Sequence, residues 1–225
     1  MKFNRARLRP GLILGVRGSG LFSRLIIWAE TKWLQRTCRK LGVPFPACGV
    51  LFSHSAQTIS LPCVPDGQSS IAIGEQLPLG STVTTLEAYE RKIAAGKIRV
   101  RVYEVIGARC HDELHATKNW WLHCKGRRYD WFAYPRLLFK AVVMDFTESR
   151  IPILRAIGET VAGFEWRGWC TQDVAESYQI DPPALDIYQT ANPTPLTQQQ
   201  VAGEAPMKPG KRVTLRDVTA EMMAK

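Results

Sequence analysis

The sequence lacks any apolar run long enough to cross a bilayer. A membrane-spanning helix needs about 20 consecutive apolar residues, and the apolar runs of this 225-residue chain are far shorter. The basic N-terminus is followed by an apolar stretch of only six residues, Gly11 to Val16, and then by Arg17 instead of a small-residue cleavage site. We therefore expect a protein made in the cytoplasm without a secretion signal.

Cysteine pairs with metal-site or disulfide spacing are also missing. The six cysteines form no CxxC pair and are too sparse for a disulfide framework, so free thiols are expected. His111 and His115 are four residues apart, as zinc ligands on one helix face often are. No standard zinc spacing is completed around them, and we expect no metal and no other cofactor. The residues considered for zinc are Cys110, His111, His115, His123 and Cys124.

Acidic residues are nearly absent from the first forty positions. Ten lysines and arginines stand there against one acid, Glu30, in a chain whose net charge is +10. Basic segments attract polyanions in general. Residues 1–40 are therefore expected either to bind an anionic partner, such as peptidoglycan, another polymer or lipid, or to act only as a solubilising face. Contact with nucleic acid stays open.

Hydrophobic residues make up 45% of the chain, which suits a globular protein with one large domain. Apolar stripes three to four residues apart predict helices, and alternation predicts strands. The predicted strands cover residues 12–16, 50–60, 70–74 and 98–103, and the predicted helices cover residues 19–36, 85–95, 112–124, 135–145, 152–161 and 171–178.

The composition changes at Asp181 to Asp-Pro-Pro, Asn-Pro-Thr-Pro, a glutamine triplet and Lys-Pro-Gly-Lys. Such a stretch is typical of an extended linker without its own core. We expect residues 1–180 to form the folded domain and residues 181–225 to form a Pro/Gln-rich extension. Its last residues, 214–225, are expected to form a short helix that docks on a protein partner.

A candidate nucleophile, Cys170, lies at the opening of the predicted helix 171–178, in WCTQDVAESY. Unpaired amide groups and the dipole at a helix N-terminus stabilise a thiolate, which is the reactive form of cysteine. A small buried core cysteine is the competing interpretation.

A base and its orienting group are available in the two strands before and after the Pro65-Asp66-Gly67 turn. Pairing His54 with Glu75 in an antiparallel hairpin places the centre of that hairpin beside this turn. Opposed β-carbons lie about 5 Å apart, so Glu75 would hold one ring nitrogen of His54. The other ring nitrogen would then act as the base that takes the proton of the Cys170 thiol.

The order of these motifs resembles that of the circularly permuted NlpC-type cysteine peptidases, a papain-like family that includes YiiX-like and YebB-like proteins of bacteria and phages. The resemblance covers roughly residues 10–180. The similar segments are GLILGVRGSG for the family's first strand, Ser53-His54 for its "SH" strand, Ile73-Gly74-Glu75 for "IEA", TLEAYERK for the next helix, RRYDWFAY for "YDW" and CTQDVAESY for the closing "CSELVAEAY".

The resemblance implies an α+β, permuted papain-like fold with an antiparallel sheet packed against helices. It implies Cys170 as nucleophile, His54 as base and Glu75 as orienter of a cysteine peptidase or amidase. Peptidoglycan stem peptides are the implied substrate, so the implied role is cell-wall degradation by a phage- or virion-associated protein, or by one delivered to the cell envelope. The chain departs from the family's "GD", from the apolar residues after "SH" and from "EA", at Gly11-Leu12, Ser55-Ala56-Gln57 and Glu75-Gln76.

Two alternatives stay open. One is a lipid acyltransferase or N-acyl amide hydrolase of the same fold, compatible with an interfacial face at Leu21, Phe22, Trp28 and Trp33. The other is a non-enzymatic virion or structural component that uses residues 181–225 for docking.

Overall fold

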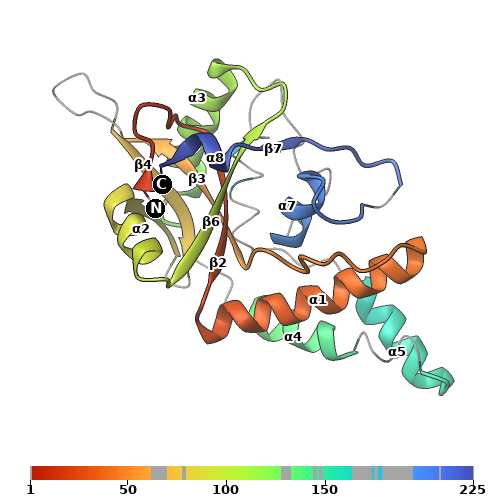
Figure 1. Ribbon diagram of the computed structural model, residues 1–225. Helices are drawn as coiled ribbons and strands as arrows, with labels where there is room; N and C mark the ends of the chain where they lie inside the picture. Colours follow the sequence, from red (N-terminus) through yellow and green to blue (C-terminus); the bar gives the residue numbers. More distant parts are fainter. Residues whose placement is uncertain are drawn as a thin grey trace.

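The computed structural model describes residues 2–61, 70–77, 80–127, 133–143, 146, 149–163, 174, 177–178, 195–207 and 209–224. Its centre is a six-stranded antiparallel sheet with helices packed against it, so the fold class is α+β, as the sequence predicted (Figure 1). The strand order is β5-β4-β3-β2-β6-β7. These strands are β2 (Ile13–Gly18), β3 (His54–Ser60), β4 (Ile71–Leu77), β5 (Gly80–Thr85), β6 (Ile98–Val105) and β7 (Leu215–Asp217).

The two faces of the sheet have separate cores because side chains alternate along each strand. On the first face, β2 residues Leu14 and Val16 pack with helix α2 (Leu86–Ala94) and with helix α8 (Thr219–Met222). A small sheet of β1 (Lys2–Phe3) and β8 (Met223–Ala224) covers the same face. On the second face, Ile13 packs with helix α3 (Cys110–Asn119) and helix α7 (Pro195–Val201). The π-helical turn η1 (Trp120–Cys124) extends α3 over β4.

Helix α2 forms almost where the sequence predicted it. Thr85 begins it by accepting a 3.2 Å hydrogen bond from the amide of Ala88, and Gly96 follows it in the left-handed region at φ 65°. Leu86 and Tyr89 lie on one side of the helix and are buried against the first face. This placement brings the Tyr89 hydroxyl to strand β4.

Helix α1 (Leu21–Leu41) is longer than the predicted 19–36 segment. Leu34 and Cys38, four residues apart, are both buried and carry the apolar stripe one turn further, and Gly42 ends the helix at φ 64°. With α4 (Ala133–Val143) and α5 (Pro152–Gly163), it forms what we call the helical lobe (Figure 1). Ala29 of α1 packs on Ala141 of α4 in this lobe.

Residues 195–207 and 209–224 differ from the extension that was expected. Strand β7 pairs with β6, with Leu215 opposite Val105, and Leu215 is 1% exposed. Met222 of α8 and Val201 of α7 are buried in the cores of the first and second face. These segments therefore belong to the same fold as the sheet, and the predicted short terminal helix docks on this chain itself. Residues 181–194 lie outside the described residues.

Candidate active site

His54 and Glu75 are brought together, although by a different register from the predicted one. In the β3–β4 pair, Glu75 lies opposite Ala56, two residues beyond His54. A shift of two residues keeps both side chains on the same face, because side chains alternate with period two. Diagonal neighbours of this kind remain within reach of long side chains. His54 Nε2 lies 3.1 Å from Glu75 Oε2 on the first face.

Two hydroxyl groups hold the Glu75 carboxylate from neighbouring elements. Thr84 of β5 donates a 2.6 Å hydrogen bond to Oε1, and Tyr89 of α2 donates a 2.8 Å hydrogen bond to Oε2. Glu75 itself is 3% exposed. A buried carboxylate is stable only when its charge and lone pairs are satisfied, and here His54, Thr84 and Tyr89 satisfy them.

The pKa of Glu75 reflects this environment. Burial raises the pKa of the carboxyl, but the hydrogen bond and charge of His54, together with the Thr84 and Tyr89 hydroxyls, bring the pKa below its ordinary value of 4.5. Glu75 is therefore ionised at neutral pH and presents a fixed negative charge to the imidazole.

The His54 side chain is 18% exposed and belongs to the first residue of β3, beside Val16 near the end of β2. Because Glu75 contacts Nε2, a neutral imidazole donates its Nε2 proton to the carboxylate and carries its lone pair on Nδ1. Nδ1 is thus the nitrogen that would act on a thiol or a substrate.

Cys170, the predicted nucleophile, lies outside the described residues, as does Cys63. Parts of the segment after Cys170 are described. Ser177 donates a 2.7 Å hydrogen bond to Gln57 of β3, and the Tyr178 hydroxyl donates one to the carbonyl of Gly11. Val174 and Tyr178 join the core of the second face. Val174, Ser177 and Tyr178 are therefore anchored to β3 and to the residues before β2, on the face of the sheet opposite to His54.

The glutamine triplet contributes buried contacts that the sequence did not reveal. Gln199 donates a 2.7 Å hydrogen bond to the carbonyl of Gly49 and accepts one of 2.9 Å from the amide of Leu51, in the loop that leads into His54. Gln198 accepts a 2.6 Å hydrogen bond from Ser55. A polar triplet between proline-rich stretches is typical of a linker, so nothing in the sequence predicted that these glutamines are buried.

Thr84 and Tyr89 were also missed as parts of the site. Each has a weak sequence signal, because Tyr89 falls three residues after Leu86 on one helix face. Thr84 lies opposite Ile73, whose side chain shares the face of Glu75 two residues further along β4. Recognising that both hydroxyls reach Glu75 requires the register of the strands. The register predicted for the β3–β4 pair differs from the observed one by two residues.

The residues considered for zinc do not converge. The rings of His111 and His115 lie 4.1 Å apart, and the His111 side chain is 67% exposed. Cys110 is exposed, whereas Cys124 is buried with Trp120 in the core of the second face. Within the described residues, no group of three or more metal-ligating side chains occurs. Among the described cysteines, Cys38, Cys48 and Cys110 carry free thiols, and Cys124 is not in a disulfide.

The basic segment 1–40 is not one uniform surface. Arg5 pairs with Glu87 and Glu90, and Arg9 pairs with Glu104 and Glu113. These ion pairs tie the start of the chain to α2, β6 and α3. The other basic residues of this segment are concentrated on α1, whose one acid, Glu30, is buried.

The chain matches no protein-family model, and a search of the curated proteins finds no match. The likeness to permuted NlpC-type peptidases stays a prediction, and the function is argued from the site. In the described part of the chain, no helix has the length and apolar character to cross a membrane.

Proposed function

We propose that this protein is a cysteine hydrolase that cleaves an amide bond, with Cys170 as nucleophile, His54 as general base and acid, and Glu75 as the residue that orients the imidazole. The observation that carries the proposal is the 3.1 Å contact between His54 and Glu75. The sequence motifs that led to both residues also led to Cys170.

The environment of Glu75 favours an orienting role over a merely structural ion pair. Replacing a buried ion pair by apolar groups is often neutral or stabilising, so such a pair needs a reason other than stability. Here the carboxylate is immobilised by two hydroxyls, while its histidine partner keeps partial exposure at a strand end. A fixed acceptor on Nε2 sets the tautomer that makes Nδ1 basic, which is what a nucleophile's base requires.

One described contact ties the chain near Cys170 to the strand of His54. Ser177, seven residues after Cys170, donates its hydrogen bond to Gln57, three residues after His54. The contact supports the proposed pairing of Cys170 with His54, because only a short stretch of chain separates each of them from it.

In the proposed reaction, Nδ1 of His54 takes the proton of the Cys170 thiol, and the thiolate attacks the carbonyl carbon of the amide. The imidazolium then gives that proton to the leaving amine as the C–N bond breaks, leaving a thioester. Neutral His54 next takes a proton from a water molecule as the water oxygen attacks the thioester carbonyl. The C–S bond breaks, the carboxylic acid leaves, and the imidazolium returns the proton to the sulfur of Cys170. Glu75 stabilises the imidazolium in both halves of the cycle.

Peptidoglycan stem peptides are the proposed substrate, on the strength of the resemblance. A lipid acyltransferase or N-acyl amide hydrolase is the second candidate, favoured by the exposed Leu21, Phe22 and Trp28 of α1. The non-enzymatic component loses part of its support, because residues 195–207 and 209–224 pack on this chain's own sheet. Docking through residues 181–225 and association with a virion remain proposals.

The test is digestion of purified peptidoglycan and, separately, of labelled phospholipid and N-acyl amide substrates, with products resolved by mass. We expect a new amine and a new carboxylic acid from peptidoglycan or from the N-acyl amide, or a lysophospholipid and a fatty acid from the phospholipid, and loss of these products in Cys170→Ala and His54→Ala. Cys48→Ala, which removes an exposed thiol elsewhere, is the matched control and should keep full activity. Undiminished turnover by Cys170→Ala, or no turnover of any of the three substrates by the unaltered protein, would refute the hydrolase.

A further inference from the structure

The helical lobe exposes an unusual amount of apolar surface. The described part of the chain has fourteen well-exposed large hydrophobic side chains, and eight of them belong to α1, α4, α5 or the residue that precedes α5. Scattered single hydrophobic residues on a surface need no explanation, but a gathering on three adjoining helices does. We call these eight residues the exposed apolar set: Leu21, Phe22, Trp28, Phe139, Val142, Ile151, Ile153 and Ile157.

Helix α5 is the extreme case. Ile153 is 68% exposed and Ile157, one turn further, is 44% exposed, so its apolar stripe faces solvent. Figure 1 shows α5 at the far end of the lobe from the sheet. A helix with this composition normally buries such a stripe. The stripe on α5 therefore points to an occupant outside this chain.

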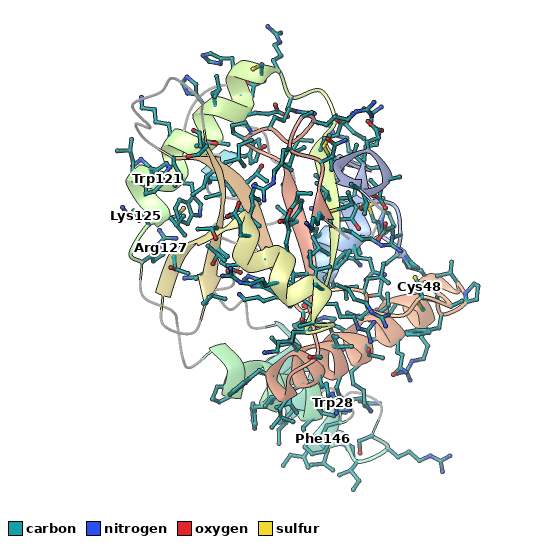
Figure 2. All side chains as sticks on the ribbon, turned by 60° about the vertical axis from the view of Figure 1, so that its left-hand side comes forward. Trp28, Cys48, Trp121, Lys125, Arg127 and Phe146 are labelled. Atoms are coloured by element: carbon teal, nitrogen blue, oxygen red, sulfur yellow. The ribbon has the colours of Figure 1, made fainter. Side chains whose placement is uncertain are left out.

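Helix α1 exposes a mixed stripe. Its solvent side carries Leu21, Arg24, Trp28, Gln35 and Arg39, which lie on one side of the helix. Figure 2 shows Trp28 on the side of α1 that faces away from the sheet. Arginine and tryptophan beside aliphatic residues make a surface suited to a lipid headgroup layer, where the ring and aliphatic groups enter the apolar boundary and the guanidinium stays at the phosphates.

The positive charge of the helical lobe favours an anionic lipid surface over a second copy of this chain as its partner. Helix α1 has five basic residues and one acid, Glu30, which is 1% exposed. Arg150 precedes α5, and α5 itself contains Arg155 and Glu159. In a two-fold dimer through this surface, two patches with the same positive charge would meet, since an isologous interface pairs identical patches. An anionic lipid surface attracts these basic residues instead.

We propose that the helical lobe docks on the surface of a membrane that contains anionic lipids, with the exposed apolar set inserted among the headgroups and the basic residues of α1 and α5 at the phosphates. The lobe lies outside the His54–Glu75 site, and the proposal does not depend on catalysis. The sequence indicated an anionic partner for residues 1–40 and an interfacial face at Leu21, Phe22, Trp28 and Trp33. The structure adds α4 and α5, which supply half of the exposed apolar set.

The test uses the full chain with Cys170→Ala, so that substrate turnover plays no part, and vesicles of phosphatidylcholine with and without phosphatidylglycerol. We expect cosedimentation with the anionic vesicles, weakened by salt and weak on pure phosphatidylcholine. The double variant Ile153→Glu/Ile157→Glu and the single variant Trp28→Glu should each lower the vesicle affinity about tenfold or more. Leu122→Glu, at a position 65% exposed on η1 outside the lobe, is the matched control and should bind as before.

Circular dichroism and thermal unfolding establish that each variant is folded, and all of these positions are exposed, so native stability is expected. Trp28→Phe gives a second readout, because quenching by brominated lipid should fall when that tryptophan is removed. Absence of vesicle binding overturns the proposal. So does binding that Ile153→Glu/Ile157→Glu and Trp28→Glu leave unchanged, or a dimer in light scattering that those variants dissolve while vesicles have no effect.

Discussion

The Tyr89 hydroxyl donates a 2.8 Å hydrogen bond to Glu75, and this contact joins helix α2 to the carboxylate that meets His54. Thr84 holds the other carboxylate oxygen from the neighbouring strand. The position of the imidazole is thus determined by three elements, β4, β5 and α2, whose residues follow one another within a short stretch of chain.

Removing the charge of Glu75 is expected to impair turnover more than binding. Glu75→Gln keeps the shape of the side chain but loses the negative charge that stabilises the imidazolium, so we expect kcat to fall by roughly a hundredfold, at the low end of general acid–base contributions. KM should stay nearly constant, because Glu75 is buried and does not meet substrate. Steady-state kinetics on the substrate identified by product analysis measure both constants. A rise in KM at constant kcat would instead assign Glu75 to substrate binding.

The two hydroxyls are expected to matter for stability. Tyr89→Phe and Thr84→Val each leave one carboxylate oxygen with fewer donors, which should lower the free energy of unfolding by about 1–3 kcal/mol. Thr84→Ser keeps the hydroxyl and serves as the control for Thr84→Val. Urea denaturation measures the differences, and equal stability of Thr84→Val and Thr84→Ser would show that the 2.6 Å hydrogen bond contributes nothing.

The lowered pKa of Glu75 predicts a pH dependence with a definite sign. A carboxyl whose pKa is lower in the folded state than in the unfolded state contributes stability above its unfolded pKa, near 4.5, and loses that contribution as the pH falls through the folded value. The contribution of the Glu75 charge to the difference in unfolding free energy between the unaltered protein and Glu75→Gln should therefore shrink as the pH falls below about 4.5. A difference that grows on acidification would mean that the folded state raises the pKa of this group.

Strand β7 predicts that the C-terminal residues are needed for folding. Leu215→Ala removes a side chain that is 1% exposed in the core of the second face, so we expect a loss of about 2–5 kcal/mol. Val213→Ala, two residues earlier and 44% exposed, should change stability by less than about 0.5 kcal/mol. Chemical denaturation of both variants tests this, and equal stabilities would restore the view of residues 195–224 as an unattached extension.

Much of the sheet follows from local patterns, whereas the details of the site depend on long-range packing. Alternation marked β6, and the turn at Pro65-Asp66-Gly67 indicated that His54 and Glu75 belong to adjacent strands. The register still differed by two residues, because hydrophobic alternation constrains the face of a side chain but not the choice between positions two apart. The His54–Glu75 contact was predicted correctly because a two-residue shift preserves the face.

The C-terminal region was harder to read for a physical reason. Strand β7 has three residues and lies at the sheet edge after a segment rich in proline, glycine and lysine, so its own sequence barely shows a strand. Its position is decided by pairing with β6, more than a hundred residues earlier. Composition indicates only the conformation that a segment prefers in isolation. Gln198 and Gln199 are buried because Ser55 and the loop at 49–51 provide hydrogen-bond partners for them.

The most direct test of the account is the rate at which a mild alkylating reagent modifies each thiol near pH 6, followed by mass mapping, in the unaltered protein and in His54→Ala. The account predicts that Cys170 is modified well ahead of the exposed Cys48 and Cys110, and that this preference is lost in His54→Ala. Modification of Cys48 and Cys110 before Cys170, or a Cys170 rate unaffected by the loss of His54, would contradict it.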